Sequence, residues 1–162
     1  MPYLSQLSDG SGRELAYVGM MMLYAYPVDL ETNPDGTITA SFEGLPGATD
    51  GATREEALRE AQDLLVTSLS IYVDDGAAVP VPPAANGRPL VYVPMLEAAK
   101  LALHTAMLEN RVSNVELARR LGVAESSVRR MRDLLHESKI GRVEAALRAL
   151  GRQATIEVLE VA

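Results

Sequence analysis

The spacing of hydrophobic residues changes along this chain, and the change predicts two kinds of structure. Residues 23–52 carry stretches with an apolar side chain at every second position, which is typical of strands that bury one face. From residue 53 onward, apolar side chains mostly recur every three or four positions, as in amphipathic helices. Residues 90–93 return to a strand-like pattern, as do residues 155–161 near the end of the chain. We therefore expect an α+β fold, with a small sheet followed by an all-α unit.

The first half is predicted to be a βββαβ unit. Strands 23–30 and 37–43 flank Asn33–Gly36, where proline and an Asp-Gly pair favour a tight turn, so the two strands should form a hairpin. Pro27 lacks a backbone N–H and indicates a sheet edge or a bulge. The remaining elements are a third strand or return loop at 48–52, a helix to about Val73 that begins with a capping box of Thr53 and Glu56, a Pro- and Ala-rich connector at 77–89, and a fourth strand at 90–93.

Two short helical patterns in the second half are separated by a glycine. Ser113 and Glu116 form a capping box that would start the first helix. Gly122 can adopt the backbone angles of a tight turn, and this order of elements predicts a helix-turn-helix. The second helix would bury Val128, Met131 and Leu135. Further helices are indicated by Leu96, Ala99, Lys100, Leu103 and Met107 before this pair, and by Ile140, Val143, Ala146, Leu147 and Leu150 after it.

The second helix of this pair is the one expected to enter the major groove of DNA. At about 100° per residue, its outer face carries Ser126, Arg129, Arg130 and Asp133. Arginine commonly reads guanine edges, so Arg129 and Arg130 are the best candidates for base contacts, while Asp133 either leaves the groove or accepts from a cytosine amine. The candidate DNA-binding residues are Ser126, Ser127, Arg129, Arg130, Arg119, Arg120 and Arg132, the last three on phosphates or in solvent. The alternative is a solvated helix face.

Charge separates the two halves of the chain. Residues 1–95 contain 4 Lys/Arg and 13 Asp/Glu, a net charge of −9, whereas residues 96–162 contain 11 and 9, a net charge of +2. The second half therefore suits nucleic acid, and the first half suits a basic partner or is acidic only for solubility. The candidate residues for binding such a partner are Asp29, Glu31, Asp35 and Glu43.

Composition and spacing argue against an enzyme. The chain has no cysteine, which excludes disulfides, thiolate metal sites and a cysteine nucleophile. His104 and His136 are isolated in predicted helical segments, without the pattern of a catalytic triad. The acidic hairpin residues could be neighbours, but the βββαβ unit is too short to supply a full two-metal nuclease site. We expect no catalysis, no metal and no cofactor.

The two ends of the chain and its location give weaker expectations. No apolar run approaches the length of a membrane span and no segment resembles a signal peptide, so a cytoplasmic protein is expected. Residues 1–19 are interpreted as a loose extension or an expression-derived leader. Residues 155–161 predict either a terminal strand that pairs with a symmetry mate or a frayed tail. A homodimer or a dimer of dimers is expected through the helical half.

One set of motifs points to a known family. It consists of Asp35-Gly36, Phe42, Leu45-Pro46-Gly47, Thr53 and Glu55-Glu56-Ala57, followed by a helix and a Pro-rich loop. This order resembles the HicB-type antitoxins of type II toxin–antitoxin systems, many of which also carry a helix-turn-helix extension similar to the second half. The likeness covers about residues 22–155, with Ala48 where many relatives have a cysteine.

The resemblance implies a function for each half. Residues 20–93 would have a partly degraded RNase H-like fold and would bind and block a small basic RNA-cleaving toxin. Residues 94–162 would dimerise and bind the operator DNA of the toxin–antitoxin operon. A transcription regulator whose first module senses a small molecule remains the alternative.

Overall fold

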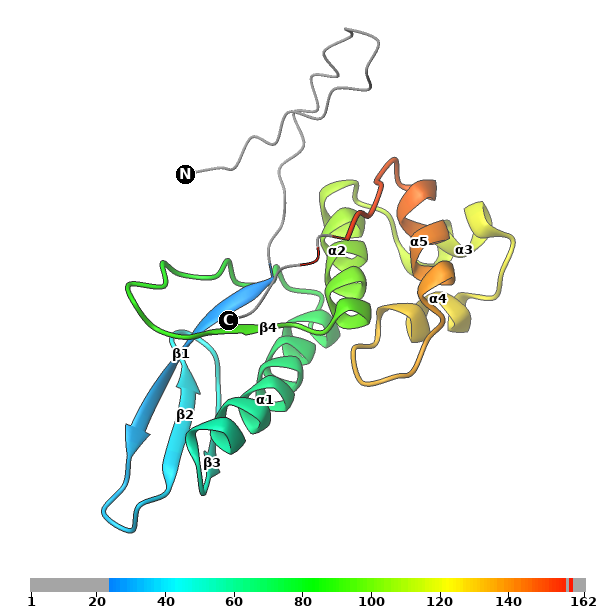
Figure 1. Cartoon of the computed structure of the whole chain (residues 1–162). Coiled ribbons are helices and arrows are strands. Elements are labelled where there is room, and N and C mark those ends of the chain that lie inside the picture. The colour runs from blue at the N-terminus through cyan, green and yellow to red at the C-terminus, as the bar shows by residue number, and fades with distance from the viewer. Residues whose placement is uncertain (1–23, 157, 159–162) are drawn as a thin grey trace, which may run out of the picture.

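The computed structural model describes residues 24–156 and residue 158, and the predicted extension at 1–19 lies outside these residues. The described part has the predicted α+β class, with a small sheet and one long helix followed by four shorter helices (Figure 1). The elements are β1 (Ala25–Thr32), β2 (Ile38–Phe42), β3 (Ala48–Gly51), α1 (Arg54–Asp74), β4 (Leu90–Tyr92), α2 (Met95–Glu109), α3 (Asn114–Leu121), α4 (Glu125–Arg132) and α5 (Ile140–Ala149).

The four strands form one antiparallel sheet in the order β3-β2-β1-β4. The predicted hairpin joins β1 to β2, and Gly36 has the positive φ of 88° that its turn requires. After α1, the connector 77–89 contains no helix or strand, runs past β1 and returns as β4 (Figure 1). The predicted βββαβ order is therefore present, while the likeness to the RNase H fold stays a prediction.

Pro27 does not mark an edge strand, because β1 lies between β2 and β4. β1 pairs with β4 over Ala25–Pro27 and with β2 only from Val28 onward. The N–H of Val28 donates to the carbonyl of Pro89 at 3.0 Å on the β4 side, so the nitrogen of Pro27 faces the opposite side. There β2 has already ended at Phe42. The missing N–H of proline thus leaves no ladder hydrogen bond unmade.

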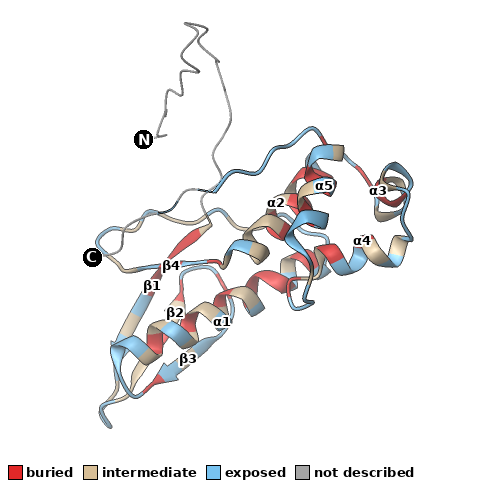
Figure 2. Ribbon diagram, turned by 45° about the vertical axis from the view of Figure 1, so that its right-hand side comes forward, coloured by how far each residue is buried: buried red, intermediate tan, exposed pale blue. Residues whose placement is uncertain are grey.

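Helix α1 covers one face of the sheet and turns a buried stripe toward it (Figure 2). Its N-terminus has the predicted cap, in which the Glu56 N–H donates to Thr53 Oγ1 at 3.1 Å. The Ser68 hydroxyl donates to the carbonyl of Pro46 at 2.8 Å and ties the Leu-Pro-Gly turn to the helix. The first core comprises Tyr26, Val28, Ala40, Phe42, Leu45, Ala57, Ala61, Leu65, Leu69, Val73, Val91, Val93, Leu101 and Leu134.

The helical half has a second core, but it is not an independent body. Leu101 of α2 and Leu134 after α4 belong to the first core and pack the helical half onto the sheet unit. Gly122 ends α3 in the left-handed conformation, with φ of 65°, as its predicted turn requires. The second core comprises Leu103, Ala106, Met107, Val112, Leu117, Ala118, Val128, Met131, Val143, Ala146, Leu147 and Leu150.

Three local predictions for this half differ from the structure. Helix α4 ends at Arg132, so Leu135 is 65% exposed and Leu134 takes its place in the interior. His136 lies in the loop between α4 and α5, outside any helix. At the C-terminal end, Thr155, Ile156 and Val158 lie in no strand, and the remaining positions of the predicted terminal strand lie outside the described residues. In the described part, none of the helices combines the length and apolar character needed to cross a bilayer.

The contact between β3 and α1 gives a prediction for Gly51. A Cβ atom at this buried glycine would lie 2.3 Å from the backbone nitrogen of Ala57, so Gly51→Ala must push the strand and the helix apart. We expect a loss of about 1–3 kcal/mol in the free energy of unfolding, measured by denaturant titration. Gly141→Ala in α5 is the control, since a Cβ there meets open space. Equal stability of the two variants would contradict this packing.

Candidate functional site

The face of the sheet opposite α1 carries acidic side chains. Strand alternation places Asp29 and Glu31 of β1 on this outer face, where both are exposed. Glu31 pairs in register with Thr39 of β2, which in turn pairs with Asp50 of β3. The Thr39 hydroxyl donates to Asp50 Oδ1 at 2.5 Å. A polar row therefore crosses three strands with a carboxylate at each end.

Asp50 was missed in the sequence because the third strand was too short to assign with its register. In β3, the exposed Ala48 and Asp50 alternate with the half-buried Thr49. Had this strand been recognised in the sequence, its alternation would have placed Asp50 on the outer face of the sheet. The sequence-predicted Asp35 is occupied within its own turn, where it accepts from the N–H and hydroxyl of Thr37 at 3.0 and 2.7 Å. These hydrogen bonds lower the pKa of Asp35. Glu31 has no such partner among the described residues.

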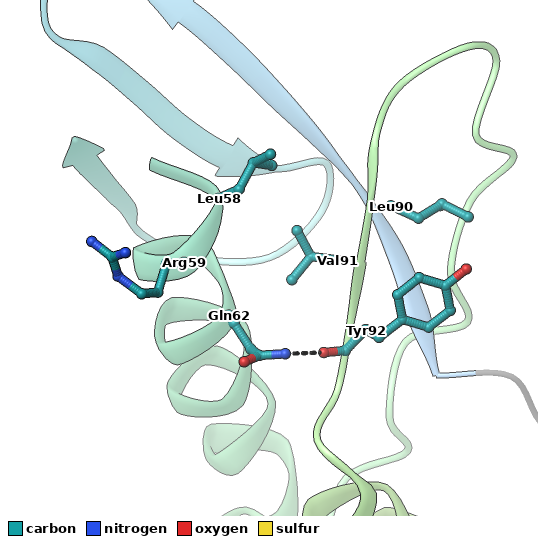
Figure 3. Close-up of a pocket in the computed structure, with 6 residues that line it drawn as sticks. All are labelled: Leu58, Arg59, Gln62, Leu90, Val91 and Tyr92. Atoms are coloured by element: carbon teal, nitrogen blue, oxygen red, sulfur yellow. Dashed lines mark hydrogen bonds between the residues drawn. The ribbon is translucent and has the colours of Figure 1, made fainter. Parts of the chain in front are cut away.

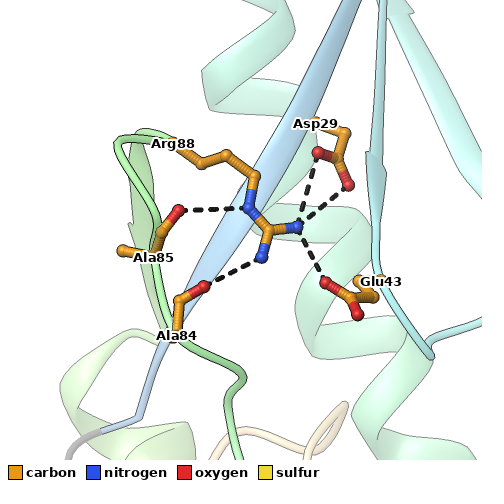
Figure 4. Close-up of polar contacts among 5 residues, drawn as sticks. All are labelled: Asp29, Glu43, Ala84, Ala85 and Arg88. Carbon is orange, nitrogen blue, oxygen red and sulfur yellow. Dashed lines mark hydrogen bonds and ion pairs between the residues drawn. The ribbon is translucent and has the colours of Figure 1, made fainter.

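Arg88 of the connector lies between the other two predicted carboxylates, as Figure 4 shows. Its Nη1 lies 3.3 Å from Asp29 Oδ2 and 3.0 Å from Glu43 Oε2. Nη2 and Nε donate to the carbonyls of Ala84 and Ala85 at 2.9 and 3.1 Å, which fix the guanidinium in place. Arg88 thus partly neutralises the acidic face at Asp29 and Glu43. Glu31 and Asp50 form the part of this face that Arg88 does not reach.

The carboxylates of this face do not assemble a metal site. In the part of the chain that the structure describes, no group of three or more His, Asp and Glu side chains is arranged to hold a metal ion. What this face can do chemically is to attract cations and to form hydrogen bonds through its carboxylates and hydroxyls.

The predicted DNA-facing residues lie mainly on the surface of α3 and α4. Ser126, Arg129 and Arg130 are exposed on α4, and Ser127 is half-buried beside them. Arg129 Nη2 lies 2.9 Å from Glu125 Oε1, one turn earlier on the same helix. Such exposed pairs contribute little to stability, so they leave the guanidinium available to a partner.

Helix α3 has a similar surface pair of arginines. Arg119 and Arg120 lie 2.9 and 2.8 Å from the carboxylate of Glu116. Their hydrogen bonds, chiefly that from Arg119, lower the pKa of Glu116 to about 2. Asp133, predicted to leave the groove or to contact a cytosine, lies just past the end of α4 and accepts from the N–H of Leu135 at 2.9 Å.

Arg132 is placed differently from its prediction as a phosphate or solvent contact. One turn after the buried Val128, it lies on the inner side of α4 and turns into the protein. Its Nη2 lies 2.9 Å from His104 Nδ1, and its Nη1 donates to Asn114 Oδ1 at 2.8 Å. Nη2 also reaches the carbonyl of Val73, the last buried residue of α1, at 3.4 Å. Burial lowers the pKa of Arg132.

The contact between α2 and the end of α4 involves two fully buried polar side chains of α2, His104 and Lys100. His104 Nε2 lies 2.7 Å from the carbonyl of Ala77, which can only accept, so Nε2 carries the proton and Nδ1 accepts from Arg132. The Lys100 ammonium donates to the carbonyl of Asp133 at 2.7 Å and to that of His136. We call Lys100, His104 and Arg132 the polar junction. The sequence placed Lys100 on an apolar stripe, and that position was the signal for its burial.

The polar junction predicts a pH dependence of stability. Burial is the main cause that lowers the pKa of His104 below its ordinary value, and the charge of Arg132 adds to it. The unfolded chain therefore binds this proton more readily than the folded chain does. Stability contributed by neutral His104 is complete above about pH 6.5 and is lost as the pH falls below it.

We expect the free energy of unfolding to fall between about pH 7.5 and pH 5.5, and to fall less steeply in His104→Gln. Denaturant titrations at several pH values measure this slope, and His136→Gln, at an exposed position, controls for the loss of a histidine. An unchanged slope in His104→Gln would show that another group governs stability in this range.

The fold and its surfaces define a two-part α+β protein, with an acidic sheet face in one part and exposed arginines in the other. Residues 25–102 match a family described as HicB-like antitoxin of bacterial toxin–antitoxin systems. The chain is 39% identical over 134 residues to antitoxin HicB 1 of Photorhabdus laumondii subsp. laumondii. This alignment covers 82% of the chain and 86% of the relative.

Two further relatives match over a similar length. The chain is 41% identical over 140 residues to antitoxin HicB of Pseudomonas fluorescens, covering 85% of this chain and 95% of the relative. It is 35% identical over 133 residues to antitoxin HicB of Escherichia coli K12, covering 81% and 96%. The chain therefore belongs to the HicB antitoxin family, which confirms the resemblance found in its sequence motifs.

Proposed function

We propose that this antitoxin binds a small basic RNA-cleaving toxin through the outer face of its sheet and blocks the toxin's active site. Residues 25–93 contain 3 Lys/Arg and 11 Asp/Glu, a net charge of −8. A surface that binds RNA is usually basic, and an acidic sheet face is complementary to it in charge. The row from Glu31 through Thr39 to Asp50, with an exposed carboxylate at each end, is the observation that carries this proposal. The antitoxin itself performs no catalysis in this scheme.

The helical half would serve a second partner. We propose that α3 and α4 form a helix-turn-helix that binds operator DNA and represses the toxin–antitoxin operon. The left-handed turn at Gly122 and the exposed arginines of α4 support this assignment. In a homodimer, two copies of α4 would enter successive turns of the major groove, about 34 Å apart.

The alternative, a regulator that senses a small molecule, has less support. The hollow shown in Figure 3 lies between α1 and β4 and is lined by Leu58, Arg59, Gln62, Leu90, Val91 and Tyr92. Its volume of about 270 Å³ is below the range of about 300–1,000 Å³ usual for ligand sites. Gln62 Nε2 also donates to the carbonyl of Tyr92 at 2.8 Å, so one of the few polar groups of the hollow is already hydrogen-bonded within the protein.

Charge reversal at Glu31 tests the toxin-binding face. We expect Glu31→Lys to weaken binding of the proposed small basic toxin by about tenfold or more, because like charges would then meet. Asp63→Lys, on the exposed side of α1 away from the sheet, makes the same charge change and should bind as the wild type does. The measurement is calorimetric titration with growth rescue in cells that express the toxin. Equal weakening by both variants would exclude a specific role for this face.

Substitutions at Arg129 and Arg119 test the DNA-binding helices. We expect Arg129→Ala to cost about 1–3 kcal/mol on the promoter duplex upstream of the gene and little on a scrambled duplex, since a base contact is lost. Arg119→Ala should weaken both duplexes and lower the salt slope by about one. Fluorescence anisotropy at two salt concentrations separates these effects. Wild-type binding by both variants would argue that α3 and α4 do not contact DNA.

A further inference from the structure

A second hollow lies beside the outer face of α4, at the edge of the proposed DNA-binding surface, with which it shares Ser127 and Arg130. It has a volume of about 220 Å³, enough for several waters and hence for a phosphate group. Three segments meet around it: α4, the loop that follows, and the first turn of α5. Its lining residues are Ser127, Arg130, Met131, His136, Glu137, Ser138, Lys139 and Arg142. We call it the basic hollow.

The cations of the basic hollow differ from the others of the helical half. Arg130, Lys139 and Arg142 have no ion pair or side-chain hydrogen bond among the described residues, and all three line the hollow. Apart from Arg111, every other Lys and Arg described in this half has a carboxylate, carbonyl, amide or imidazole partner. Glu137 is the one acidic residue in the lining, so the hollow keeps an excess of positive charge.

Hydrogen bonds from Lys100 and Ser138 order the loop that forms one wall of the basic hollow. The buried Lys100 ammonium binds the carbonyls of Asp133 and His136, which fixes the backbone of the loop after α4. The Ser138 hydroxyl donates to the carbonyl of Arg130 at 3.3 Å and links the loop to the helix. A site whose backbone is already ordered loses less conformational entropy when it binds a ligand.

We infer that the basic hollow binds a backbone phosphate of DNA, with Arg130, Lys139 and Arg142 as its ligands. The inference rests on the proposed DNA binding by α4. It changes the role expected for Arg130, which becomes a phosphate ligand instead of a base reader and leaves Arg129 as the base-reading candidate. It also adds Lys139 and Arg142, which the helix pattern did not select because they lie beyond the helix-turn-helix.

The test compares the full-length wild type with the double variant Lys139→Gln/Arg142→Gln and the single variant Arg130→Gln. The probes are the promoter duplex directly upstream of the gene and a scrambled duplex of equal length, each at several salt concentrations. Because phosphates carry no sequence information, each variant should bind both duplexes more weakly than the wild type, by the same factor of roughly tenfold for the promoter and the scrambled duplex. The slope of the logarithm of the binding constant against the logarithm of the salt concentration should fall by about one per lost contact. Arg148→Gln, on α5 but paired with Glu144, is the matched control and should bind as the wild type does.

Other outcomes overturn the inference in distinguishable ways. If the wild type binds the promoter and the double variant binds it equally well, the hollow is not a DNA site, although the proposed function stands. If a variant loses only its preference for the promoter, its side chains read bases. If toxin binding falls while DNA binding is unchanged, the hollow serves the protein partner. If the wild type binds neither duplex, the proposed DNA binding itself fails. Thermal unfolding of each variant, with Lys139→Gln alone as a milder change, excludes misfolding as the cause.

Discussion

The half-buried guanidinium of Arg132 holds α4 against the rest of the protein. It reaches His104 of α2 and the carbonyl of Val73 in α1, so three helices meet at one charge. Its Nε is the only buried side-chain nitrogen or oxygen in the described part without a hydrogen-bond partner. Loss of any partner would leave more of this partly buried charge uncompensated, which is unfavourable. The interior therefore favours one arrangement of the helical half on the sheet unit.

This arrangement separates two surfaces of opposite charge. The acidic face lies on the side of the sheet that α1 does not cover, and three cations without a side-chain partner among the described residues, Arg130, Lys139 and Arg142, lie at α4 and the start of α5. Because the surfaces use different elements, the proposed binding of a basic toxin and of DNA would not compete for the same side chains. Arg88 reduces the negative charge of the acidic face, since it already pairs with Asp29 and Glu43.

Local signals in the sequence predicted the elements well. The caps at Thr53 and Ser113 and the turn at Gly122 depend on neighbouring residues, and all three are present. The family assignment from the Leu-Pro-Gly turn and its neighbours is also confirmed.

Contacts between distant residues could not be predicted in the same way. Pro27 is accommodated because β1 changes partners there, and Arg132 is half-buried where the end of α1 comes close to α4. The outward alternation of Asp50 likewise has meaning only once β3 is paired with β2. The acidic face was thus partly predictable, whereas the polar junction and the basic hollow required the fold.

Amide hydrogen exchange of the antitoxin, alone and with its toxin, tests the separation of the two surfaces most directly. The separation predicts that the toxin slows exchange in β1, β2 and β3 and leaves residues 125–142 unchanged, while promoter DNA protects residues 125–142 and leaves the sheet unchanged. Slower exchange at 125–142 with the toxin, with no change in the sheet, would contradict the assignment of the acidic face to the toxin.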